Sequence, residues 1–344
     1  MIPQTRRQAA TAAGHRGAPR RATAAVVAAA ALAALLAGCS DDTPKVPAQA
    51  AAAAPIPQGV QDPAVIPSAA ADAGCANPTS SYAPLSPMPA PGKMPAGSTM
   101  AKIQARGRLI VGVDQNTYLF GYLDPNSGVI QGFDIDMAHA MAKAIFGDPS
   151  KIQFVAITSA ERIPYVQKGT VDMVADTMTI NCDRWRQVAF SDVYYQAGQS
   201  VLVAKTSTAR SIADLGGQKV CAAAGSTSIT NIAQAKSKPI PVSVNDWTDC
   251  LVMLQQGQVA AISTDDTILR GLAAQDPNTK LVGGDFTDEP YGLAFAQGNV
   301  DLVKFANGVL AQMRGDGAWA SIYDKWLGGP APAPPSPAPY KNPS

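Results

Sequence analysis

Residues 170–195 form the stretch that most constrains how this chain can fold. Val171, Met173 and Ala175 alternate with Asp172 and Val174. This alternation has the period of a strand with at least one buried face. The stretch therefore predicts a sheet strand that ends near residue 175.

Short polar groups and one guanidinium follow the end of this strand. They are Asp176, Thr177, Thr179 and Arg184. In open α/β sheets, ligands bind just beyond the carboxyl ends of strands. The planar fork of Arg184 matches a carboxylate. We therefore expect a small-anion site here, with a surface ion pair between Arg184 and Asp183 or Asp192 as the alternative.

The first 38 residues combine features of an export signal. They contain five arginines and no acidic residue, and an apolar run at 22–34 leads to Leu36-Ala37-Gly38-Cys39. This order is typical of a secretory signal, and the apolar run is short for a membrane span. The ending L-A-G-C resembles a bacterial lipobox, which implies that Cys39 becomes the lipidated first residue. We predict a signal peptide at 1–38 and lipid anchoring to the outer face of the cell membrane.

Charge and histidine content exclude several function classes. Without the leader, 22 Lys and Arg stand against 26 Asp and Glu, a net charge of −4, which argues against nucleic-acid binding. The remaining chain has one histidine, His139, so a zinc cluster is not expected. A Ser-His-Asp triad would have to use His139, which lies off the apolar stripe of its predicted helix.

Cysteine content points to an oxidising compartment. Four cysteines follow Cys39, and an even number outside the cytoplasm suggests disulfides with three connectivities. They are Cys75, Cys182, Cys221 and Cys250.

The rest of the chain is predicted to contain two successions of alternating strands and helices, flanked by low-complexity ends. Residues 39–99 predict an Ala- and Pro-rich tether, and residues 329–344 a disordered Pro-rich tail. Strands at 109–113, 152–155 and 171–175 alternate with helical segments, which predicts a parallel sheet with helices on its faces.

The second succession repeats the strand-to-helix pattern. A strand at 219–223 leads to Gly225-Ser226-Thr227-Ser228, which opens a helix. Backbone N–H groups at a helix start attract an anion, although the same residues would also supply an ordinary N-cap. Asp265 follows a buried strand, where it either receives an ammonium group or caps the next helix.

Several short motifs occur in a specific order. They are Gly132-Phe133-Asp134-Ile135-Asp136, residues 177–184, Phe190-Ser191-Asp192, Gly225-Ser226-Thr227, Thr264-Asp265 and Lys325-Trp326-Leu327-Gly328. The order resembles the extracytoplasmic polar-amino-acid-binding proteins of ABC importers, solute-binding protein family 3. It is most similar to actinobacterial glutamate/glutamine-binding lipoproteins, over about residues 100–328.

The resemblance implies an α/β fold, a two-lobed clamshell of the type II periplasmic-binding-protein class. Lobe 1 would comprise 100–198 and 291–328, and lobe 2 would comprise 199–290. Two hinge crossings are expected near 195–200 and 289–293. A single amino acid would bind between the lobes, which close around it by hinge motion.

The resemblance also assigns roles to the polar residues. Arg184 would bind the ligand α-carboxylate, together with the backbone N–H of Thr227 beside Ser226. Thr177 and Thr179 would supply a carbonyl and a hydroxyl to the α-ammonium and carboxylate. Asp265 would pair with the α-ammonium.

The resemblance also indicates which residues select the side chain of the ligand. The run Ser159-Ala160-Glu161-Arg162-Ile163-Pro164 resembles a segment of glutamate/aspartate-binding proteins. There Ser159 and Arg162 would face the ligand side chain. Arg162 would favour a distal carboxylate, so acids are expected ahead of amides. A surface pair between Arg162 and Glu161 is the alternative. Asp176 departs from the family pattern and works against an acidic ligand, and either Thr117 or Tyr118 would cover the ligand.

The resemblance implies a binding protein without catalysis, cofactor or metal, whose partners are an amino acid and an ABC permease. The alternatives are a sensor read by a signalling membrane protein, and a clamshell-fold dehydratase with Asp176 as its acid or base. Because each lobe should keep its own disulfide, we predict the pairs Cys221–Cys250 and Cys75–Cys182. The sequence leaves open which of Glu, Asp, Gln and Asn is bound.

Overall fold

The computed structural model describes residues 55–66 and 77–341. The predicted leader 1–38, Cys39 and Cys75 lie outside the described residues. No helix within the described ranges is both long and apolar enough to cross a membrane.

Lobe 1 is built on a five-stranded sheet of order β5-β1-β6-β14-β7. The strands are β1 (Leu109–Val113), β5 (Ile152–Ala156), β6 (Met173–Val174), β7 (Ala189–Phe190) and β14 (Ala294–Phe295). β1 is parallel to β5 and β6, whereas β14 is antiparallel to β6 and β7. The sheet is therefore mixed where the sequence predicted a parallel one, because β14 enters from lobe 2 and inserts between strands of the first succession.

Helices and one small sheet complete lobe 1. The helices are α1 (Thr99–Arg106), α2 (Phe133–Phe146), α3 (Arg162–Gln167), α4 (Cys182–Trp185), α8 (Val300–Gly315) and α9 (Ala318–Leu327). The small sheet joins β2 (Asn116–Thr117), β3 (Gly121–Leu123) and β4 (Ile130–Gln131). α2 buries Phe133, Met137 and Met141 at helical spacing in the lobe 1 core, and Gly147 ends it in a left-handed conformation.

Lobe 2 is built on a second sheet of order β10-β9-β11-β8-β12. Its strands are β8 (Tyr195–Ala204), β9 (Lys219–Ala223), β10 (Ile240–Val244), β11 (Ala261–Asp265) and β12 (Thr279–Val282). The helices are α5 (Thr227–Gln234), α6 (Trp247–Gln255) and α7 (Asp266–Gln275), with a 3-10 turn at Ile212–Leu215. These strands and helices enclose a core of their own.

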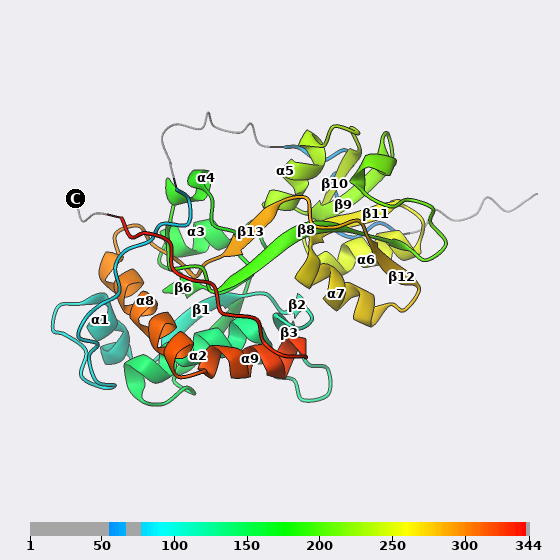
Figure 1. Ribbon diagram of the computed structural model, residues 1–344. Coiled ribbons are helices and arrows are strands. Elements are labelled where there is room, and N and C mark those ends of the chain that lie inside the picture. The colour runs from blue at the N-terminus through cyan, green and yellow to red at the C-terminus, as the bar shows by residue number, and fades with distance from the viewer. Residues whose placement is uncertain (1–54, 67–76, 342–344) are drawn as a thin grey trace, which may run out of the picture. The chain divides into compact units, whose positions relative to one another are not determined.

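Two strands carry the chain between the lobes. β13 (Asp288–Tyr291) lies beside β8 (Figure 1) and pairs antiparallel with its first residues. Tyr291 lies opposite Tyr195 in this pairing. β8 then continues into the lobe 2 sheet, where Gln199 lies opposite Asp265. The end of β11 is therefore held next to the crossing.

A disulfide joins β9 to α6 within lobe 2. Cys221 and Cys250 are fully buried, their Cα atoms lie 5.6 Å apart, and 29 positions separate them in the sequence. This confirms the predicted Cys221–Cys250 pair. Cys182 is also disulfide-bonded. Because Cys75 is outside the described residues, the Cys75–Cys182 pair stays a prediction.

The segment before lobe 1 makes defined contacts. Gln61 and Ser243 exchange backbone hydrogen bonds of 2.9 and 3.0 Å, which places residue 61 on the edge of β10. The indole N–H of Trp185 donates to the carbonyl of Pro78 (2.6 Å), and Ser81 donates to that of Phe190 (2.7 Å).

The described part of the Pro-rich tail, 329–341, also packs where the sequence predicted disorder. Lys341 donates its backbone N–H to the carbonyl of Ser81 (2.7 Å), and its ammonium lies 3.1 Å from the ring centroid of Trp185. Cation–π attraction holds this end of the tail. Prolines lose little backbone freedom on ordering, so few contacts suffice.

Candidate functional site

Polar side chains of the two lobes meet in one small cavity near the crossing strands. Its lining residues are Arg162, Thr177, Thr179, Arg184, Ser226, Thr227, Ser228, Trp247, Asp265 and Ile268. The cavity volume is about 10 Å³, which corresponds to roughly one water molecule. An amino acid can enter only if the lobes or these side chains move apart.

A strained turn after β6 positions the lobe 1 residues. Thr177 has a φ of 40°, a left-handed value that a β-branched residue rarely adopts. Its N–H donates to Asp134 (2.8 Å), which also accepts from the hydroxyl of Tyr194 (2.6 Å). Burial raises the pKa of Asp134 to about 7. The buried acid of the Gly132–Asp136 motif therefore holds the turn that carries Thr177 into the cavity wall.

Arg184 is the cation that contacts both lobes. Its guanidinium donates to the carbonyl of Thr179 in lobe 1 (2.6 Å) and to that of Gly225 in lobe 2 (3.2 Å). Burial lowers its pKa to about 9 and Arg162 adds to the fall, while the charges of Glu289 and Asp265 oppose it. Arg184 is thus buried yet still charged at neutral pH, and the alternative of a surface ion pair does not describe it.

Asp265 places an unpaired acceptor in the same cavity. One carboxylate oxygen accepts from the hydroxyl of Tyr291 (2.6 Å), while Oδ1 is buried without a hydrogen-bond partner. Burial raises the pKa of Asp265 to about 8, and the charge of Glu289 contributes to the rise. A buried acceptor without a donor is unfavourable, and an ammonium group would satisfy it.

The start of α5 faces the cavity from lobe 2. Ser226 is its N-cap, accepting from the N–H of Ile229 (3.2 Å) and donating to the carbonyl of Ala223 (2.7 Å). The first N–H groups of a helix have no acceptor within the helix. Ser226 therefore caps α5, and the N–H groups of the first turn remain suited to an anion.

Arg162 lines the cavity, whereas Asp176 lies behind it. Arg162 donates to the carbonyls of Ser159 (3.1 Å) and Asp176 (2.8 Å), and its Nε lies 3.9 Å from the Asp176 carboxylate. Both side chains are almost fully buried, so the alternative of Arg162 as a surface residue does not describe it. Burial raises the pKa of Asp176 well above its usual range against the opposing charge of Arg162, and the charges of Asp114 and Asp134 add to the rise.

Other predicted residues lie outside the cavity wall. Ser159 lines a separate cavity beside Gly225 and contacts Arg162 through its carbonyl. The ring of Tyr118 packs against Tyr122, with centroids 4.8 Å apart, and Thr117 donates its hydroxyl to Asp114. Neither candidate for the covering loop therefore lines the cavity.

Three contributors were missed from the sequence. Trp247 begins α6 and lines the cavity. Ile268 of α7 lines it too. Glu289 does not line the cavity, but it accepts the hydroxyls of Thr179 and Thr227 that do. The only indication of Glu289 in the sequence was its position in the hinge crossing expected near 289–293.

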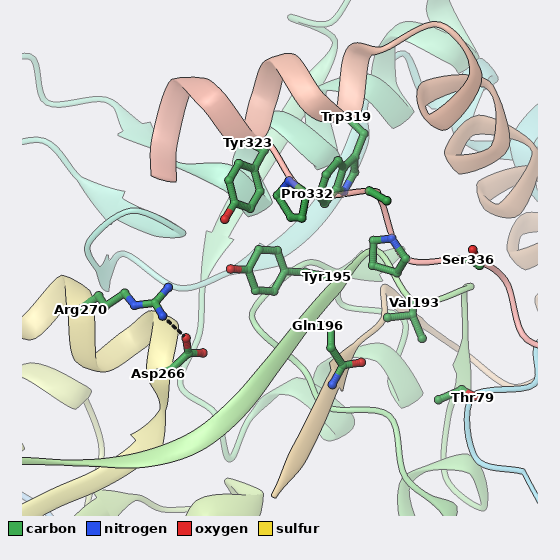
Figure 2. A pocket seen from close by; sticks show the side chains of 12 residues that line it. Thr79, Val193, Tyr195, Gln196, Asp266, Arg270, Trp319, Tyr323, Pro332 and Ser336 are labelled. Carbon is green, nitrogen blue, oxygen red and sulfur yellow. Dashed lines mark ion pairs between the residues drawn. The ribbon is translucent and has the colours of Figure 1, made fainter. Parts of the chain in front are cut away.

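A larger cavity of about 580 Å³ lies beside β8 (Figure 2). Tyr195, Trp319 and Tyr323 project toward it, together with the tail. Asp266 and Arg270 supply its charges and pair with each other at 2.8 Å. A zwitterion needs a separate cation and anion once water is expelled, so the small cavity is the better candidate. Within 55–66 and 77–341, no cluster of three His, Cys, Asp or Glu side chains is arranged for a metal ion.

The chain is similar in sequence to known glutamine-binding proteins. The chain is 44% identical over 230 residues to the ABC transporter glutamine-binding protein of Bacillus subtilis (strain 168), covering 67% of this chain and 84% of that protein. It is 42% identical over 201 residues to the glutamine-binding protein of Geobacillus stearothermophilus, covering 58% and 77%.

The solved structures agree with the fold. An ancestral arginine-binding protein bound to glutamine superposes with a TM-score of 0.61 at 36% identity, covering 65% of this chain and 99% of that one. This likeness confirms the α/β two-lobed clamshell of type II. Residues 109–329 match the family described as bacterial extracellular solute-binding proteins, family 3. The chain therefore belongs to the bacterial extracellular solute-binding proteins of family 3.

Proposed function

We propose that this protein captures glutamine outside the cytoplasm, closes its lobes around it and delivers it to the permease of an ABC importer. The observation that carries the proposal is one cavity that brings together a buried guanidinium, Arg184, and a buried carboxyl with an unpaired oxygen, Asp265. They match the α-carboxylate and α-ammonium of an amino acid. The relatives named as glutamine-binding proteins of ABC transporters support the partner and the ligand.

The charges behind Arg162 favour a neutral side chain. Asp114, Asp134 and Asp176 are buried acidic side chains, and the charges of Asp114 and Asp134 raise the pKa of Asp176. An acidic ligand would add another negative group, whereas an amide oxygen would still accept from Arg162. We therefore place glutamine ahead of glutamate, which reverses the order that Arg162 alone favoured in the sequence.

We propose that the protein acts by binding alone. Asp176, the acid–base candidate of the dehydratase alternative, does not line the cavity. The family and the relatives are solute-binding proteins. No observation favours the sensor alternative over transport.

We also propose that a lipid on Cys39 anchors the mature protein to the outer face of the cell membrane. The support is the sequence Leu36-Ala37-Gly38-Cys39 after a basic and apolar leader. Residues 40–54 would then separate the membrane from the first described residue.

Wild-type protein should bind glutamine most tightly among the twenty amino acids, and Arg184→Ala should bind none of them. Losing one partner of a buried charge pair costs on the order of 2–5 kcal/mol. A thermal-shift screen followed by calorimetry checks both statements, because a ligand of the native state raises the melting temperature. Normal affinity in Arg184→Ala would remove this residue from the site.

The ratio of glutamine to glutamate affinity should respond to two variants in opposite ways. Arg162→Met should weaken both ligands and glutamate more, because an ionised acceptor gains about twice as much from a charged donor. Asp176→Asn should strengthen the binding of glutamate and so lower the ratio of glutamine affinity to glutamate affinity. Titration of both ligands into each variant measures this. Tighter binding of glutamate by the wild type would contradict the proposed ligand.

Binding of glutamine should release a proton from Asp265. The pKa of this carboxyl is about 8 without ligand, and the ammonium should lower it, so affinity should rise with pH and level off above about 8. Calorimetry in two buffers of different ionisation enthalpy, at about pH 7, counts the protons. Asp265→Asn should bind weakly and release none.

Asp266→Asn is the matched control, because Asp266 pairs with Arg270 and lines the other cavity. It should bind glutamine and release the proton as the wild type does. Equal proton release in Asp265→Asn would assign the titration to another group.

Cys39→Ser should abolish membrane anchoring without changing ligand affinity. Labelling of the expressing bacterium with a radioactive fatty acid, followed by fractionation, should show label on the wild-type protein only. Label that persists in the variant would rule out Cys39 as the lipidated residue.

A further inference from the structure

Glu289 on β13 joins side chains of both lobes. Its side chain is 2% exposed. Oε2 accepts from the hydroxyls of Thr179 in lobe 1 (2.7 Å) and Thr227 in lobe 2 (2.8 Å). Oε1 accepts from Thr287 (2.8 Å) and from the amide of Asn231 (3.1 Å). All four neighbours donate, so both carboxylate oxygens have hydrogen-bond partners.

These contacts fix the polarity of two hydroxyl groups. A threonine hydroxyl has one hydrogen to donate and two lone pairs to accept with. Thr179 and Thr227 lie closer to the same oxygen of Glu289 (2.7 and 2.8 Å) than to each other, where either hydroxyl could donate across 3.5 Å. The shorter bond to a carboxylate oxygen is the stronger one, so each hydrogen points to Glu289. Toward any further partner, both hydroxyls can therefore only accept.

The accepting oxygens belong to the proposed amino-acid site. Thr179 and Thr227 line the small cavity, whereas Glu289 lines a neighbouring cavity of about 640 Å³ on the other side of them. Glu289 thus acts on the site through its neighbours. Because one oxygen bonds a residue from each lobe, this arrangement requires the lobes to be close together.

We propose that Glu289 is a positioning residue that sets the hydroxyls of Thr179 and Thr227 as acceptors for N–H groups of the ligand. The inference rests on the proposed function and refines it. The ligand carboxylate is then held by nitrogen donors alone, Arg184 and the first turn of α5. The α-ammonium is held by Asp265 and the two hydroxyl oxygens.

The test is a double-mutant cycle read by calorimetry with glutamine. Glu289→Gln keeps the shape of the side chain but can donate, which frees the hydroxyls to turn. It should raise the Kd about tenfold or more. In a Thr179→Val, Thr227→Val background, the same substitution should change the Kd by less than about twofold, because the hydroxyls it acts through are gone.

Thr287→Val is the matched control. It removes a hydroxyl that donates to Glu289 but does not line the amino-acid cavity. Its Kd should stay within about twofold of the wild-type value. An equal penalty for Glu289→Gln in both backgrounds would reduce Glu289 to a structural residue and overturn the inference.

A crystal structure of the wild-type protein with glutamine tests the same point without variants. Both hydroxyls should lie within hydrogen-bonding distance of Glu289 and of a ligand nitrogen. A hydroxyl that contacts a ligand carboxylate oxygen would refute the proposal. If the wild type binds no amino acid, the proposed function itself fails. If it binds glutamine but the effects of the substitutions in the double-mutant cycle are additive, only the role of Glu289 is removed.

Discussion

Burial of the Arg184 guanidinium between the lobes is the interaction on which the site depends. A buried cation is unfavourable unless hydrogen-bond acceptors and opposite charges surround it. Here one carbonyl from each lobe accepts from it, and the acidic side chains of Glu289 and Asp265 oppose the fall of its pKa. A ligand carboxylate is a stronger partner than a neutral carbonyl, so the arrangement favours exchange of those carbonyls for the ligand.

The crossing strands connect this chemistry to the movement of the lobes. Tyr291 and Glu289 lie on β13, and they bond Asp265 of lobe 2 and Thr179 of lobe 1. β8 pairs with β13 at one end and with β11 at the other. A hinge normally needs only to bend. In this protein the crossing strand also supplies side chains that bond cavity-lining residues of both lobes, so the candidate site and the crossing are linked.

Much of the fold could be predicted because its signals are local. The bounds expected for two strands, residues 109–113 and 219–223, are those of β1 and β9. Arg184 and Asp265 were candidates because each follows a predicted strand, and the resemblance to a known family gave them their roles. Cys221 and Cys250 followed from a strand and a helix that must pack together. For the strands, the pattern of burial along a short segment carried the information.

By itself, the sequence determined the strands, the helices and the residue types that reach the cleft. The tertiary structure decided which of these residues meet. Thr179 and Thr227 lie 110 and 62 positions from Glu289, and no periodicity relates them. Contacts between distant residues also decide three other features. They are the antiparallel insertion of β14, the position of Asp176 behind Arg162 and the position of Tyr118 outside the cavity wall. Side-chain direction at a strand end and the donor it finds across a cleft depend on long-range packing, which a local pattern does not encode.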